Sequence, residues 1–400
     1  MNEVLAVGLI LAGALAAGRL AHRFGLPEVT AYLLVGILIG PASLDLVTHE
    51  AVLTLEFLSE IALGFILFGI GAIFEAETFR RVGRAVVRIV LLETGLTFAL
   101  VFTLLLAVGT SIPVALFLGV IAMETAPATT LMVVREYDAK GPLTDRLLAL
   151  LALNNMIVLA AFGVAVAAIE AASIGIGDGI GALIYRTVYR LLWPTVGGVA
   201  LGIVLGLLLD VAAARISEHG EGITLAVAAV LLAVGGSRAL GLSPLFTTLA
   251  MGATMANASA HSAFLISALG RIDPPLFATF FVLAGAELRP SAVAEMGAAG
   301  LVYVMARPLG KVVGVRLALR HVDVPEAVRH HLGRCIISSS SLALGLSLQV
   351  RRVFPEFAPP VSAVALAAVL VFEVVGPLLT RRSLIAAGEA GADVAPAPTL

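Results

Sequence analysis

Long apolar runs separated by short polar loops make up most of the chain. Windows of about 20 apolar residues, the length that crosses the hydrocarbon core of a bilayer, predict about thirteen membrane-spanning helices. They lie near residues 3–20, 28–44, 51–74, 86–109, 112–134, 143–170, 193–214, 221–237, 244–258, 274–288, 296–318, 331–350 and 359–380. The pattern therefore indicates an all-α integral membrane protein.

Two segments fall outside these windows. Residues 177–192 place two tyrosines and two arginines on one side of a helix, which is typical of a connector at the membrane surface. With the next span they form an expected linker at about 177–214. The Ala- and Pro-rich tail, residues 383–400, is expected to be disordered, so the transmembrane domain is predicted to cover residues 1–382.

The composition excludes several classes of protein. Hydrophobic residues make up 60% of the chain and charged residues 13%, whereas soluble domains carry roughly 25% charged residues. The net charge of −2 does not indicate a nucleic-acid partner, and the single Cys335 excludes an intrachain disulfide. With neither a Cys/His cluster of metal-ligand spacing nor a glycine-rich nucleotide loop in the sequence, we expect no metal centre, no cofactor and no enzyme activity.

Basic residues in short loops predict the orientation, because cytoplasmic loops carry an excess of Lys and Arg. The basic loops alternate with poorly basic ones, and they contain Arg23, Arg80, Arg81, Arg84, Arg88, Arg135, Lys140, Arg146, Arg215, Arg316, Arg320, Arg329, Arg381 and Arg382. We therefore expect a multi-pass protein of the cell inner (plasma) membrane, with the N-terminus outside and the C-terminus in the cytoplasm. Arg351 and Arg352 fall on the outer side and count against this pattern.

Four places within the spans are polar, although polar groups at bilayer depth are costly unless they line a cavity inside the protein. The fifth span carries Glu124, Thr125, Pro127 and Thr129; the sixth carries Asn154 and Asn155; the eleventh carries Arg307 and Lys311; and the twelfth carries Ser338, Ser339, Ser340 and Ser341. Spans one to six and eight to thirteen are equal in number, so the odd seventh span makes the two halves inverted. Polar interruptions at corresponding positions of inverted halves indicate the site of a secondary transporter.

Several segments resemble the cation:proton antiporter superfamily, in its Kef-type and bacterial sodium/proton exchanger branch. They are Gly25–Pro41 (GLPEVTAYLLVGILIGP), Leu63–Glu75 (LGFILFGIGAIFE), Phe280–Leu288 (FFVLAGAEL), Ala306–Gly314 (ARPLGKVVG) and Val371–Arg382 (VFEVVGPLLTRR), in the order of the family. The resemblance implies a fold of about 13 helices in inverted repeats, with two crossing unwound helices. It also implies exchange of Na⁺, Li⁺ or K⁺ for H⁺ by an elevator-like movement.

The resemblance further implies a homodimer in contact with membrane lipids. Its dimerisation helices would be those at about 3–74 and 221–288, and its mobile core helices those at about 86–170 and 296–380. Kef-type potassium systems also carry a nucleotide-binding domain, and this sequence contains none, which argues against gating of that kind.

The sequence departs from the family at the residues that matter most. Members carry an Asp at the second position of a pair in the sixth span, where this chain has Asn155, and an amide cannot titrate. Ala126 stands where some members have the Asp of a Thr-Asp-Pro. We therefore expect Glu124 to exchange the proton, with Thr125, Asn154 and Asn155 as neutral ligands and Arg307 as counter-charge.

Other interpretations stay open at this point. Thr129, Lys311, Ser339 and Ser340 are secondary candidates for the site, and Glu93 is the chief rival of Glu124. Glu373 is interpreted as a structural hydrogen-bonding residue near the inner end of its span. Alternative functions are transport of an anion or organic solute bound at Arg307, and a transport-silent or channel-like homologue. It also stays open whether Asn154 and Asn155 are natural residues or engineered replacements of aspartates.

Overall fold

The computed structural model describes residues 3–24, 26–72, 76–173, 180–216, 219–259, 264–265, 272–288, 290–291, 296–320, 322–339 and 341–391. The elements within these ranges are helices. They are α1 (Glu3–Phe24), α2 (Glu28–Ile39), α3 (His49–Thr54), α4 (Glu56–Ala72), α5 (Ala76–Ala107), α6 (Ile112–Ala122), α7 (Pro127–Glu136), α8 (Pro142–Ser173), α9 (Ile180–Ala213), α10 (His219–Ala239), α11 (Pro244–Ala258), α13 (Asp273–Glu287), α15 (Gly297–Ala318), α16 (Glu326–Cys335), α17 (Ser341–Val353) and α18 (Ala358–Ala386). The predicted all-α fold class is confirmed.

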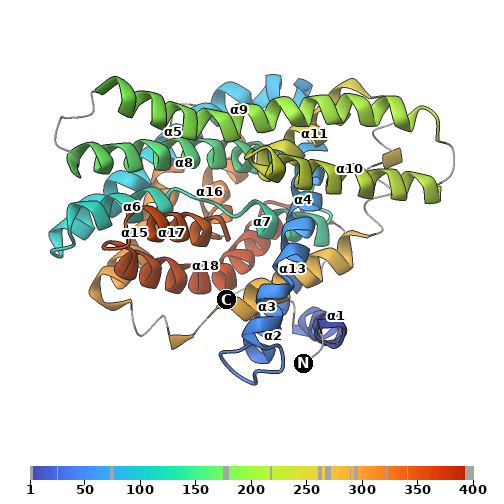
Figure 1. The fold of residues 1–400 in the computed structure, drawn as a ribbon, viewed down its shortest axis with the longest axis horizontal. Coiled ribbons are helices and arrows are strands. Elements are labelled where there is room, and N and C mark those ends of the chain that lie inside the picture. The colour runs from blue at the N-terminus through green and yellow to red at the C-terminus, as the bar shows by residue number, and fades with distance from the viewer. Residues whose placement is uncertain are drawn as a thin grey trace.

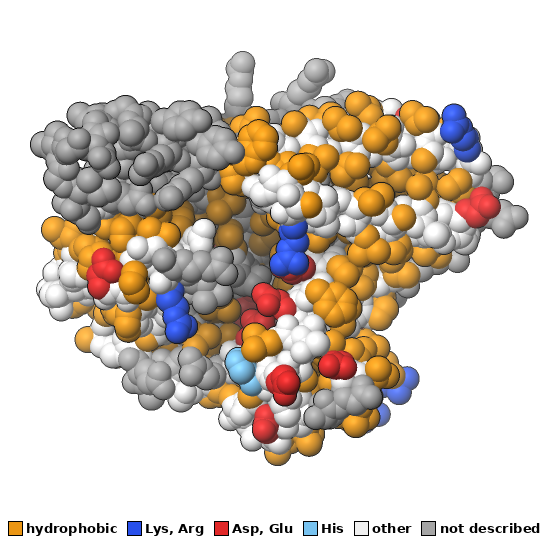
Figure 2. Space-filling model, in the orientation of Figure 1, with side chains coloured by type: hydrophobic (Ala, Val, Ile, Leu, Met, Phe, Trp, Pro, Cys, Tyr) orange, Lys and Arg blue, Asp and Glu red, His pale blue; other side chains and the backbone are white. Residues whose placement is uncertain are grey.

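The helices follow the predicted spans closely. In the described part of the chain, 8 stretches are long and apolar enough to cross a membrane, and shorter apolar helices lie at Glu28–Ile39, Pro274–Glu287 and Leu342–Arg351. Three predicted spans are each built from two helices: α3 with α4, α6 with α7, and α16 with α17. Apolar side chains cover much of the face drawn in Figure 2, as a lipid-facing surface requires.

The helices pack in two groups (Figure 1). In the first group, α2 and α4 pack on α13, and α11 lies between α4 and α9. In the second group, α15 lies along α5, α6 lies between α5 and α8, and α18 contacts α7, α15, α16 and α17. The groups meet where α8 touches α9, where α18 and α7 touch α2, and where α7 touches α4.

Paired glycines hold the first group together. A Cβ at Gly36 of α2 would collide with the backbone of Val282 and Gly285 in α13, and a Cβ at Gly285 would collide with the backbone of Leu33. Gly71 of α4 and Gly252 of α11 form a second pair of the same kind. Helices whose small residues face each other approach to backbone contact, so we call these two contacts the glycine seams.

Two boundaries differ from the sequence-based expectation. Residues 180–192 form one continuous helix with the following span, because Pro194 inside α9 does not end it. The sequence predicts a disordered tail from residue 383. In the structure α18 continues to Ala386, and the carboxylate of Glu389 is buried. Its oxygens accept hydrogen bonds from the backbone N–H groups of Leu143 (2.7 Å) and Thr144 (2.8 Å) at the N-terminus of α8, where unpaired N–H groups need acceptors.

Candidate transport site

The two broken helices meet in the centre of the second group. Between α6 and α7 the chain is not helical at residues 124–126, and Pro127 fits the first turn of α7 because it has no N–H group to satisfy. A second break separates α16 from α17. The backbone N–H of Ala126 in the first break donates to the Ser338 carbonyl in the second, at 3.2 Å. The breaks are therefore joined by their own backbones.

Arg307 of α15 reaches both breaks and is completely buried. Its Nη1 donates to the Ile337 carbonyl at 2.5 Å, and its Nη2 donates to the carbonyls of Glu124 (2.7 Å) and Ser338 (3.1 Å). The guanidinium also lies 4.5 Å from the ring centre of Phe372, within range of a cation–π interaction. Arg307 thus satisfies carbonyls that the helix breaks leave without helical partners.

The Glu124 side chain is completely buried beside this guanidinium. Its Oε2 lies 3.7 Å from Nη2 of Arg307 and accepts a hydrogen bond from the Ser339 hydroxyl at 3.0 Å. Glu124 is therefore a carboxylate with a charge partner inside the protein.

Lys311, one helical turn after Arg307, forms a second buried ion pair. Its Nζ lies 2.7 Å from Oε1 of Glu93 in α5, and it also donates to the Met123 carbonyl (3.0 Å) and the Thr125 hydroxyl (2.8 Å). Nδ2 of Asn154 donates to Oε2 of Glu93 at 3.3 Å and to the Met123 carbonyl at 3.0 Å. The second pair is thus tied to the break between α6 and α7.

Glycines explain why α15 lies so close to α5. A Cβ at Gly314 would lie 2.6 Å from Cα of Glu93, and a Cβ at Gly310 would lie 2.7 Å from Cα of Thr97. Without side chains on this face of α15, its backbone approaches α5 closely, and the Lys311 ammonium reaches the Glu93 carboxylate.

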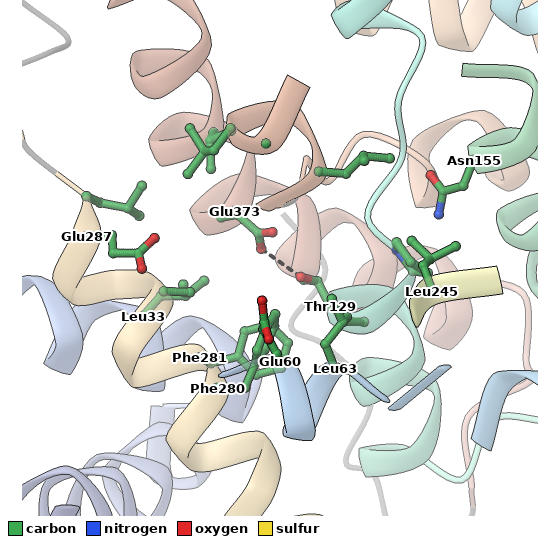
Figure 3. Close-up of a pocket in the computed structure, with 18 of the residues that line it drawn as sticks. Leu33, Glu60, Leu63, Thr129, Asn155, Leu245, Phe280, Phe281, Glu287 and Glu373 are labelled. Carbon is green, nitrogen blue, oxygen red and sulfur yellow. Dashed lines mark hydrogen bonds between the residues drawn. The ribbon is translucent and has the colours of Figure 1, made fainter. Parts of the chain in front are cut away.

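A cavity of about 430 Å³ lies between the two helix groups (Figure 3). Leu33, Leu63, Leu245 and Phe281 contribute to its wall from the first group. Its polar lining residues are Glu60, Thr129, Asn155, Glu287 and Glu373. Asn155 is 3% exposed, and its Oδ1 has no hydrogen-bond partner among the residues that the structure describes.

Glu373 of α18 faces this cavity and is 6% exposed. Its Oε2 accepts a hydrogen bond from the Thr129 hydroxyl at 2.7 Å, the contact drawn in Figure 3. Gly376 places α18 here, because a Cβ at that position would collide with Ser338 in the break between α16 and α17. The sequence does contain a signal for Glu373, since a carboxylate inside an apolar span indicates a functional residue by default.

The structure distributes the expected site residues over three neighbouring clusters. Glu124, Arg307 and Ser339 form one; Glu93, Lys311, Thr125 and Asn154 form another; and Thr129 and Asn155 line the cavity with Glu373. Ser340 lies outside the described residues. Glu124 and Arg307 do not line the cavity.

Comparison with known proteins agrees with this architecture, an all-α membrane antiporter fold. Residues 8–384 match the family described as sodium/hydrogen exchanger, transmembrane. The chain therefore belongs to the sodium/hydrogen exchanger family, within the cation:proton antiporter superfamily that its sequence resembles.

Solved structures share the fold at low sequence identity. A structure of the sodium proton antiporter MjNhaP1 from Methanocaldococcus jannaschii at pH 8 is 18% identical, with a TM-score of 0.70 over 96% of this chain and 97% of that one. An electron microscopy structure of the same antiporter is 17% identical, with a TM-score of 0.77 over 99% of this chain and 100% of that one. None of the curated proteins compared matches the chain.

Proposed function

We propose that the protein is a secondary active transporter that exchanges a monovalent cation, Na⁺, Li⁺ or K⁺, for H⁺ across the membrane. The family and the relationship to MjNhaP1 support this function. The single observation that carries it is the cavity, because carboxylate, hydroxyl and amide oxygens line it beside the broken helices. Hard cations prefer oxygen ligands, and ion sites of secondary transporters lie where such helices break.

The mechanism we propose is an elevator-like movement of the second helix group against the first. In this proposal the first group contains the dimerisation helices of a homodimer in the inner membrane, with the N-terminus outside. The walls of the cavity come from both groups, so a shift of one against the other alters access to Asn155 and Glu373. The exposed leucines on α1, such as Leu5 and Leu15, are available to lipid or to a second copy.

Glu124 is the exchanging carboxylate that the sequence favours, but its carboxylate already has a buried positive partner in Arg307. A cation bound there would lie next to the Arg307 guanidinium, 3.7 Å from the same carboxylate oxygen. Two positive charges at such a distance repel each other by several kcal/mol in a medium less polar than water, roughly 4 kcal/mol at an effective dielectric constant of 20. We therefore propose that the role of the Glu124–Arg307 pair is to join the two helix breaks.

Transport of an anion at Arg307 has less support. Both Nη atoms already donate to carbonyl oxygens of the two breaks. An anion would have to displace these carbonyls and would lie beside the Glu124 carboxylate. No contact of the described residues favours that arrangement over cation exchange.

The experiment is a flux assay on purified protein in liposomes that contain a pH-sensitive dye. We expect Na⁺, Li⁺ or K⁺ added outside to drive proton movement that liposomes without protein do not show. Proton flux that is independent of all three cations, or flux that follows an added anion and is lost in Arg307→Ala, would overturn the proposal.

A further inference from the structure

The buried charges beside the broken helices do not balance. Glu93 is paired with Lys311 at 2.7 Å, and Glu124 is paired with Arg307 at 3.7 Å. Glu373 is buried as well, yet no Lys, Arg or His nitrogen of the described residues lies within 4.0 Å of its carboxylate. An ionised carboxylate buried in this way is costly without a partner.

The surroundings of Glu373 supply ligands for a cation. The Thr129 oxygen lies 2.7 Å from its carboxylate, and Thr129 lines the same cavity. Farther along the wall of the same cavity, and apart from Glu373 in Figure 3, Asn155 offers a buried amide oxygen that has no partner in the described part of the chain. A buried carbonyl oxygen without a partner costs free energy unless water or an ion occupies the site.

We propose that Glu373 is the carboxylate that holds the proton and the monovalent cation in turn, with Thr129 as its neutral oxygen ligand and Asn155 in the wall of the same cavity. The inference rests on the proposed antiport and adds the identity of its site. It also explains how the chain works with an amide at Asn155, because α18 supplies the carboxylate that the sixth span lacks.

The exchange step conserves charge. The O–H bond of protonated Glu373 breaks, the proton leaves through the cavity, and the carboxylate binds one cation. Glu373 is neutral with its bound proton and forms a neutral ion pair with the bound cation. The two permanent ion pairs are unchanged by the step, so one proton is exchanged for one monovalent cation.

The experiment compares Glu373→Gln, Glu373→Asp and Glu124→Gln in two assays. One is the liposome flux assay, and the other is the rise in melting temperature of the detergent-solubilised protein on addition of NaCl, LiCl or KCl, with choline chloride as the ionic-strength control. A matched control is Glu356→Gln, the same substitution at an exposed residue between α17 and α18 that does not line the cavity, which is expected to retain both signals.

We expect Glu373→Gln to lose cation-driven flux and the cation-dependent rise in melting temperature while eluting as a folded protein. Glu373→Asp retains flux, with the half-saturating cation concentration shifted several-fold. Glu124→Gln retains the cation-dependent rise, whatever its own stability. Retention of both signals by Glu373→Gln, or loss of the rise in Glu124→Gln alone, overturns the assignment. Absence of cation-driven flux in the unmodified protein contradicts the antiport itself.

Discussion

The resemblance of the sequence implies an aspartate at the position of Asn155, and Asn155 lines the same cavity as Glu373, a buried carboxylate from another helix. An amide offers an oxygen ligand but neither charge nor proton. The chemistry that the family places on one residue is therefore proposed to be shared between Asn155 and Glu373. Substitutions at these two positions that remove one methylene group or add one charge test this division.

Asn155→Asp is predicted to change the number of charges moved. It adds a second carboxylate to a site that already has one more negative than positive group. We expect this variant to release more than one proton per cation, so that an imposed membrane potential alters its rate. Liposome flux measured at zero and at inside-negative potential checks this prediction. Equal flux of the Asn155→Asp variant at both potentials contradicts it.

The Glu93–Lys311 pair yields a stability prediction. Glu93→Gln or Lys311→Met alone leaves one buried charge without a partner, which destabilises a protein by about 3–5 kcal/mol. The double variant removes both charges and is expected to lose less than either single variant. Melting temperatures in detergent measure the difference, and losses that simply add would contradict the pairing.

At the scale of elements, the breaks between α6 and α7 and between α16 and α17 determine the site. α18 reaches the break between α16 and α17 through Gly376, and α15 approaches α5 through Gly310 and Gly314. Glycine here serves close approach of helices rather than flexibility. These helix contacts orient the Glu373 and Lys311 side chains.

Gly376→Ala is predicted to displace α18 from Ser338, because the added methyl group would overlap it. Overpacking of this kind costs typically about 1–3 kcal/mol. We expect a lower melting temperature and weaker cation-dependent flux. Gly235→Ala in α10 is the matched control, because a Cβ there meets nothing within 4 Å. Equal behaviour of the two variants would show that the contact at Ser338 is not tight.

The sequence predicted the helices better than the site. Apolar windows locate the spans, and Pro127 with the serines after Ile337 marks the breaks, because these signals are local. Which side chains meet depends on how each helix is rotated and how closely it approaches its neighbours. Local pattern therefore did not indicate that Lys311 contacts Glu93, that Glu373 faces the cavity, or that Glu389 caps α8.

For the whole molecule, the charge balance predicts electroneutral transport. If Glu373 exchanges one proton for one cation while both ion pairs persist, the net charge moved is zero. Na⁺-driven proton flux in a K⁺ gradient is expected to be the same with valinomycin, which imposes the potential, as without it. A clear acceleration or inhibition by the potential would require a second titrating group in the site.

The glycine seams bear on which helix group would move in the elevator-like movement that we propose. Where Gly36 meets Gly285 and Gly71 meets Gly252, peptide units touch directly, so these helices have no side chains that repack as one slides past another. We therefore expect the helices joined by the seams to behave as one rigid body. In the proposed elevator-like movement the second helix group then moves, and Thr129 and Glu373 move with it, so that an ion bound by Glu373 keeps its ligands while its access changes.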